Sequence, residues 1–211
     1  MKTATIIIVS MFWLSAAAMA GPSVQFTGVY GQNVNIGGTW YNGWVRAGTY
    51  ELLVDGLPMK SFCADLGDFA TYSAVEYNWA ALADIADSPF GPMGAADAGM
   101  IAAAWSAWNL ATVTQAQAAA AQVFIWEVTA DDTFDLTSGS FYLNSTDPGA
   151  QGIYDNLPCV PQPVCLAGLT HPCYQDYVVE CKIPAPGTLL LGSIGAGLVC
   201  LMRRRHSIIC C

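Results

Sequence analysis

Residues 118–127 read AAAAQVFIWE, a helical stretch with one uncharged polar side chain on its apolar face. Three- and four-residue spacings put Gln122 on the same helix face as alanines, Ile125 and Trp126. A buried amide left without a hydrogen bond costs about 1–3 kcal/mol, so we expect Gln122 to have a partner. That partner is either a strand carbonyl in the core or Cys63, the one cysteine far from the C-terminal third.

Three helices are predicted between residues 73 and 128. Residues 73–76 have capping-box spacing and begin a helical run that ends at Pro89. A second helix is predicted for 95–110, where large apolar residues recur at helical spacing. Residues 114–117 form a second capping box, which starts the helix that carries Gln122 and ends near residue 128.

Strands are predicted on both sides of the helices. Asp55-Gly56 is a hairpin signal, and the returning strand over 59–65 places Cys63 near its end. The other expected strands cover 24–30, 40–45, 48–54 and part of 138–145. We therefore expect an α+β fold, a β-rich barrel or sandwich with an inserted bundle of about three helices, within residues 21–150.

Both ends of the chain carry targeting signals. Residues 1–20 have a basic start, an apolar run and a small-x-small site that ends at Ala20, as in a cleaved signal peptide. At the other end an apolar run, 188–202, follows prolines and precedes arginines, which indicates a C-terminal membrane helix with a cytoplasmic basic tail. The prolines before the apolar run are Pro184 and Pro186, and the arginines after it are Arg203, Arg204 and Arg205.

This C-terminal segment, residues 183–211, resembles the PEP-CTERM sorting signal of exosortase-dependent bacterial proteins. Ala185 stands where that family has a glutamate between the prolines, and residues 207–211 extend beyond the basic cluster. The resemblance implies processing by an exosortase-type enzyme. It also implies an exported protein, transiently anchored in the membrane and destined for the cell surface or extracellular matrix.

Charge excludes one class of partner. Between the two signals the basic residues are Arg46, Lys60 and Lys182, against all 16 acids of the chain. Such a surface repels phosphate backbones, so no nucleic-acid partner is expected.

The sequence also lacks the motifs of a hydrolase. The one histidine between the two signals, His171, precedes a proline. We expect no enzyme activity and no cofactor.

Five cysteines lie between the signals, in an exported and therefore oxidising setting. Four of them fall in a Cys/Pro-rich segment, 151–182, predicted as a loop-rich knot with two disulfides of open pairing. Their spacings lack the close pairs of a zinc site. The four are Cys159, Cys165, Cys173 and Cys181, which leaves Cys63 over.

An unpaired thiol and a buried glutamine suggest an internal thioester between the Cys63 sulfur and the Gln122 acyl carbon. Such a bond needs a helix held against a strand and apolar walls that exclude water. Trp126 and Ile125 supply walls on the helix, and Phe62 would do so only if a bulge turned it inward. A buried cysteine that behaves as a small hydrophobe is the alternative.

These residues resemble the thioester domains of Gram-positive surface adhesins. In that family an aromatic-Cys pair near the end of an early strand is joined to the glutamine of a Thr-Gln-x-Ala-Ile-Trp motif. Phe62-Cys63 matches the first element, and residues 121–126 match the second at Gln122, Ile125 and Trp126. Thr114-Gln115 is a rival match without the Ile-Trp pair.

The resemblance implies covalent capture of a surface amine or hydroxyl, as in an adhesin or matrix crosslinker. The alternative function is a non-covalent structural or glycan-binding matrix protein that contacts polysaccharide through aromatic side chains. The candidates for that role are Tyr30, Trp40, Tyr41 and Trp44.

Asp131, Asp132 and Asp135 could bind calcium, but they lack EF-hand spacing. Three aspartates in such a short stretch are more typical of a solvated turn, so no metal is predicted.

Overall fold

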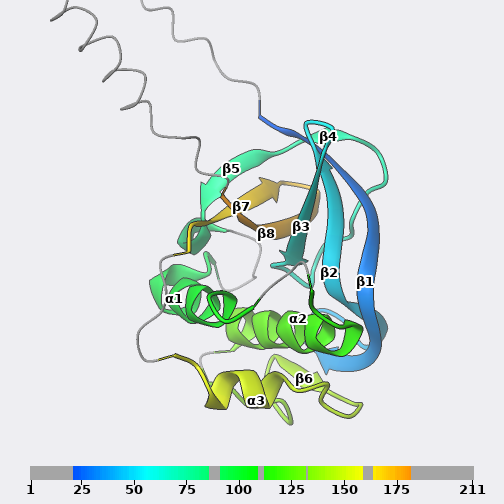
Figure 1. Ribbon diagram of the computed structural model, residues 1–211. Helices are drawn as coiled ribbons and strands as arrows, with labels where there is room; N and C mark the ends of the chain where they lie inside the picture. Colours follow the sequence, from blue (N-terminus) through cyan, green and yellow to red (C-terminus); the bar gives the residue numbers. More distant parts are fainter. Residues whose placement is uncertain (1–20, 86–90, 109–111, 132, 159–163, 182–211) are drawn as a thin grey trace, which may run out of the picture.

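The computed structural model describes residues 21–85, 91–108, 112–131, 133–158 and 164–181 (Figure 1). The predicted signal peptide, the sorting signal, Asp132 and Cys159 lie outside these ranges. Within the described residues, no helix is long and apolar enough to cross a membrane.

An eight-stranded antiparallel sheet forms most of the described structure, and three α-helices accompany it (Figure 1). This confirms the β-rich α+β class. Along the main path the strands follow in the order β4 (Val75–Glu76), β1 (Ser23–Gly38), β2 (Gly43–Val54), β3 (Leu57–Cys63), β8 (Tyr174–Glu180), β7 (Leu166–His171) and β5 (Asn78–Ala81). The eighth strand, β6 (Phe141–Leu143), lies off this path and pairs with β1.

The two ends of this path come together at Tyr77. β4 and β5 lie at opposite ends of the strand order, yet Tyr77 alone separates them in the chain. Its backbone N–H donates to the carbonyl of Pro22 (2.9 Å), and its side chain is buried. The sheet is therefore curved so strongly that its first and last strands meet.

The predicted hairpin at Asp55-Gly56 is confirmed. Asp55 has φ 51° and Gly56 has φ 77°, the paired positive values that a type I′ turn requires. The turn fixes the register of β3 against β2, with Leu57 opposite Val54 and Ser61 opposite Tyr50. The two strands expected at 40–45 and 48–54 are one continuous strand, β2.

Helix α2 (Gln115–Ala130) packs against β1 and β2, with α1 (Gly94–Trp105) and α3 (Ala150–Asp155) beside it (Figure 1). Its predicted capping box is present: Thr114 and Gln117 exchange side-chain-to-backbone hydrogen bonds. Because elements surround it, most of α2 is buried. This explains why residues 118–128 are almost continuously apolar, as expected for an enclosed helix.

The α-helix predicted from residue 73 to Pro89 does not form over residues 73–85, and residues 86–90 lie outside the described ranges. Residues 75–81 form β4 and β5, and a short 3₁₀ helix (Leu82–Asp84) follows. Glu76 does not close a capping box, since its carboxylate accepts from the backbone N–H of Gly21 (2.7 Å). Strand pairing of Val75 with Val24 and of Ala80 with Gly168 outweighs the local helical signal.

The loop-rich knot predicted for 151–182 is wrong for most of its length. Residues 166–180 form the β7–β8 hairpin, and β8 pairs with β3 inside the sheet. Val178 and Val179 are fully buried, so this segment contributes to the core. Helix α3, which was not predicted, begins just before it.

Candidate functional site around Cys63

Cys63 is the last residue of β3 and is fully buried. The N–H of Ala64 donates to Asp176 in β8 (2.9 Å). Because successive residues of a strand direct their backbone polar groups to opposite sides, those of Cys63 point toward the β2 side. The β2–β3 pairing ends at Ser61, so Cys63 has no strand partner there.

Gln122 takes the place of that missing strand. Its Oε1 accepts a hydrogen bond from the Cys63 N–H (2.9 Å), and its Nε2 donates to the Cys63 carbonyl (2.8 Å). This two-bond exchange satisfies four buried polar groups at once. The sequence left two possible partners for Gln122, a strand carbonyl or Cys63. The structure shows that the strand carbonyl bonded by Gln122 is that of Cys63 itself.

Three polar groups surround the Cys63 sulfur. Trp126 Nε1 donates to it (3.2 Å), and Gln175 Nε2 donates to it from β8 (2.6 Å). The thiol in turn donates to the carbonyl of Asp65. Trp126, predicted as an apolar wall of the site, thus contacts the sulfur as a hydrogen-bond donor.

Gln175 and Asp65 were not predicted as site residues. Gln175 is 112 residues from Cys63 and reaches it because β8 pairs with β3. The Asp65 carboxylate accepts from the N–H groups of Asp68 (3.0 Å) and Asp176 (2.6 Å), which fixes the turn after β3. The polar pair Gln175-Asp176 inside an otherwise apolar strand is the signal that could have revealed this neighbourhood.

The surroundings act on the thiol in opposite directions. Burial raises the pKa of Cys63 well above its usual value, and the Asp65 charge raises it further. The hydrogen bonds from Trp126 and Gln175 lower this pKa. Burial likewise raises the pKa of Tyr50, which neighbours Cys63 and Gln175.

The other two predicted pocket residues lie differently from Trp126. Phe62 is fully buried and packs edge-on against Trp105 (ring centroids 5.4 Å apart) and against Trp108. It thus contacts the α1 region, whereas Cys63 contacts α2 and β8. Ile125 is fully buried next to Trp126 in α2. Gln115, the rival glutamine, is exposed at the start of α2.

A surface pocket of about 350 Å³ lies beside the sulfur site. Trp126 and Gln175, the two donors to the sulfur, belong to its lining, together with Tyr50 and Asp65. Two of the aromatic residues predicted for glycan contact, Tyr41 and Trp44, also line it. Trp44 is 64% exposed, and Phe69, another lining residue, is 74% exposed.

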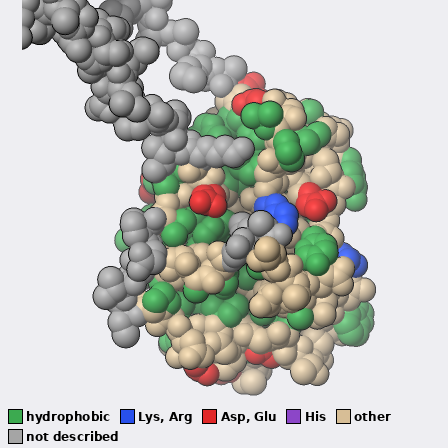
Figure 2. Space-filling model, viewed as in Figure 1, with side chains coloured by type: hydrophobic (Ala, Val, Ile, Leu, Met, Phe, Trp, Pro, Cys, Tyr) green, Lys and Arg blue, Asp and Glu red, His purple; other side chains and the backbone are tan. Residues whose placement is uncertain are grey.

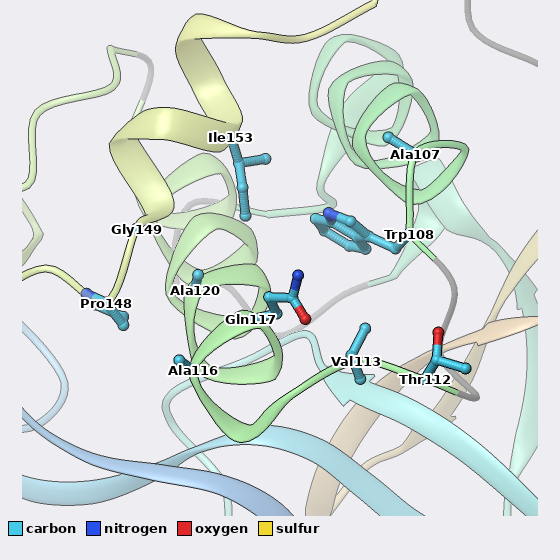
Figure 3. A pocket seen from close by; sticks show the side chains of 10 residues that line it. All are labelled: Ala107, Trp108, Thr112, Val113, Ala116, Gln117, Ala120, Pro148, Gly149 and Ile153. Carbon is cyan, nitrogen blue, oxygen red and sulfur yellow. The ribbon is translucent and has the colours of Figure 1, made fainter.

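A second pocket, of about 510 Å³, lies between the helices (Figure 3). Trp108, Gln117, Ala120 and Ile153 line it, among others. The figure shows the Ile153 and Trp108 side chains facing it from opposite sides. No residue of this lining donates to the Cys63 sulfur.

The three late cysteines within the described residues have free thiols, and two of them are neighbours. Cys165 and Cys181 lie at the open end of the β7–β8 hairpin, where the Cys181 N–H donates to the Cys165 carbonyl (2.8 Å). Burial raises the pKa of Cys181 to about 11, and the hydrogen bond with the Cys165 thiol adds to the shift. Cys173 is exposed near the turn at the other end.

The aspartates after α2 act as backbone caps. Asp131 accepts from the N–H groups of Ser140 and Phe141 (3.0 Å each), and Asp135 accepts from Thr137 and Ser138. In the described part of the chain, no group of three His, Cys, Asp or Glu side chains is arranged to hold a metal ion.

Glu127, the residue after Trp126, is fully buried. One carboxyl oxygen accepts from the Asp135 N–H (2.6 Å), and the other has no hydrogen-bond partner among the described residues. Burial raises the pKa of Glu127 to about 7, and the charges of Asp131 and Asp135 add to the shift. Glu127 therefore loses its proton at a higher pH than an exposed glutamate does.

Comparisons of this chain with protein-family models, characterised proteins and solved structures found no match.

Proposed function

We propose that the protein is an exported surface or matrix protein that captures its target covalently through a Cys63–Gln122 thioester. The observation that carries the proposal is the pairing of Gln122 with both backbone groups of Cys63 (2.9 and 2.8 Å). This pairing holds the acyl carbon of Gln122 beside the residue that bears the thiol. Effective molarities of such held groups are large, which favours reaction between them.

Burial supports the same proposal. Cys63, Gln122 and Trp126 are each at most 1% exposed, so bulk water has no direct access to an acyl group formed there. A thioester in contact with water would hydrolyse. The site thus combines a nucleophile, an electrophile and a dry enclosure.

The chemistry consists of two balanced steps. In the first, the Cys63 sulfur bonds to the Gln122 acyl carbon, the carbon–nitrogen bond breaks, and ammonia leaves with the thiol proton. This step gives up the Nε2 hydrogen bond to the Cys63 carbonyl. In the second, an amine or hydroxyl of the target attacks the carbon, the carbon–sulfur bond breaks, and the proton returns to sulfur. The target remains joined through an amide or ester, so each molecule reacts once.

Location and finer architecture belong to the same proposal. The signal peptide exports the chain, and the PEP-CTERM-like tail with its membrane helix holds it until an exosortase-type enzyme processes it. The barrel-like thioester domain extends past residue 150, because β7 and β8 complete its sheet, and the cysteines of the 151–182 segment add disulfides to it. The strong curvature that brings β4 and β5 together supports the barrel.

Mass spectrometry tests the proposal. The purified protein, kept in a phosphine reductant so that disulfides are open, should weigh about 17 Da less than its sequence requires, through the loss of ammonia. Methylamine should add to the protein, and Cys63→Ala should abolish both effects. An unmodified mass together with an alkylatable Cys63 would show that no thioester forms.

A second candidate function is non-covalent glycan binding. The observation that favours it is the exposure of aromatic rings around the 350 Å³ pocket, Trp44 and Phe69 above all. The face shown in Figure 2 carries few charged side chains, whereas Arg46, Asp65 and Asp68 belong to the lining of the pocket itself. Trp44→Ala should then weaken retention on a polysaccharide column, whereas Trp79→Ala, which removes an exposed tryptophan outside the pocket lining, should not. Equal retention of both variants and the wild type would exclude this use of the pocket.

A further inference from the structure

The Cys63 sulfur has two N–H donors aimed at it, from different parts of the chain. Trp126 Nε1 lies 3.2 Å away on α2, and Gln175 Nε2 lies 2.6 Å away on β8. A structural cysteine that only fills space needs no such donors, because a neutral thiol is a weak acceptor. Two donors on one sulfur are the arrangement that suits a sulfur carrying negative charge.

Gln175 is held in place through its own backbone. Its N–H donates to the carbonyl of Phe69 (3.3 Å), and its carbonyl accepts from the Tyr77 hydroxyl (3.2 Å). The residue is only 6% exposed. Its amide is therefore preorganised toward the sulfur, which is the condition for electrostatic stabilisation of a developing charge.

Both donors also line the 350 Å³ pocket, whereas neither Cys63 nor Gln122 does. The sulfur is therefore in hydrogen-bond contact with two side chains of the pocket lining. A target that enters from the surface would meet these two side chains before it reached the reacting atoms.

We propose that Gln175 and Trp126 are catalytic residues of the Cys63 reaction, and that the pocket they line is the entrance for the attacking amine or hydroxyl. The inference rests on the proposed thioester. When the bond forms, the two N–H groups stabilise the attacking thiolate. When the bond opens, the carbon–sulfur bond breaks, its electron pair stays on sulfur, and the same N–H groups stabilise the departing thiolate until it takes the proton of the target.

The charges around the sulfur make these donors necessary. The titratable groups that face it are Asp65 from the turn after β3, Tyr50 from β2 and Tyr177 from β8. Each of them is neutral or negative at physiological pH, and no cationic side chain is among them. Neutral N–H donors are thus the source of stabilisation for a thiolate at this site.

Rates of thioester opening test the inference. The wild type, Gln175→Leu, Gln175→Glu and Trp126→Phe are compared by intact mass during reaction with methylamine between pH 6 and 9. Gln32→Leu, in an exposed position of β1, is the matched control for a strand glutamine. Circular dichroism verifies that each variant is folded. We expect the Gln175 variants to form and open the bond at least about tenfold more slowly, as loss of a preorganised donor does elsewhere.

The pH profile separates catalysis from packing. Without the Gln175 donor the thiol pKa rises, so the rate of bond formation should increase at a higher pH than in the wild type. Gln175→Glu, similar in shape but without a donor, should show the larger displacement. A folded Gln175→Leu with wild-type rates and profile would overturn the inference while leaving the proposed thioester intact.

Two further outcomes are decisive. If the mass deficit disappears in Gln175→Leu but persists in Gln122→Leu, Gln175 is itself the acyl donor, and its assignment as a sulfur-binding residue is wrong. If the wild type shows no deficit, the proposed function and this inference both fail.

Discussion

Cys63 and the Cys165–Cys181 pair show two environments for cysteine within one sheet. Cys63 ends β3 in the core, where its sulfur faces two N–H donors and its backbone is paired with Gln122. Cys165 and Cys181 lie opposite each other at the mouth of a hairpin, the first of them exposed. The neighbouring groups determine which reaction each cysteine favours. A second thiol beside Cys165 favours a disulfide, whereas the fixed Gln122 amide beside Cys63 favours an acyl bond.

The largest expected effect comes from removing the amide at the buried site. In a Cys63→Ala background, where the amide stays intact, Gln122→Leu leaves the N–H and carbonyl of residue 63 buried without partners, which should lower the free energy of unfolding by about 3–5 kcal/mol. Chemical denaturation measures it. Gln115→Leu, in an exposed position of the same helix, is the control and should change stability by less than about 0.5 kcal/mol. Equal effects of the two changes would show that Gln122 does not complete the sheet.

The next effect concerns the peripheral pair. We expect Cys165 and Cys181 to form one disulfide, which leaves Cys159 and Cys173 for the other. Cys165→Ser should lower the unfolding free energy of the oxidised protein by about 2–3 kcal/mol, because the bridge closes a short loop. The difference should vanish in a phosphine reductant. Peptide mapping that joins Cys165 to Cys173 instead would refute the pairing.

A smaller effect concerns Glu127, next to Trp126. Its pKa is about 7 in the fold and lower in the unfolded chain, so the folded state binds more protons between about pH 4.5 and 7. The free energy of unfolding should therefore fall as the pH rises through this window, at up to about 1.4 kcal/mol per pH unit. Denaturation at several pH values measures the slope. Glu127→Gln should flatten it, and an unchanged slope would assign the pH dependence to other groups.

Local signals accounted for much of the Cys63 site. The Asp55-Gly56 turn fixes the β3 register, and the Thr114 capping box starts α2. Together they made it possible to predict that Cys63 lies near the end of a strand and that Gln122 lies on a buried helix face. The contact between Cys63 and Gln122 could be proposed because a buried amide requires a hydrogen-bond partner.

Features that depend on distant pairing were missed. Gln175 reaches the sulfur only because β8 pairs with β3, and the polar pair Gln175-Asp176 marks an unusual strand without indicating which strand it pairs with. The 75–81 segment carries a capping-box pattern but is drawn into strands by β1 and β7. Tertiary pairing outweighed local propensity in both cases.

The most direct measurement is the intact mass of the purified wild-type protein in a phosphine reductant. A thioester between Cys63 and Gln122 gives a mass about 17 Da below that of the sequence, with loss of the deficit in Cys63→Ala and in Gln122→Leu. A mass equal to that of the sequence, with Cys63 open to alkylation after unfolding, would mean that Gln122 serves only as a substitute strand.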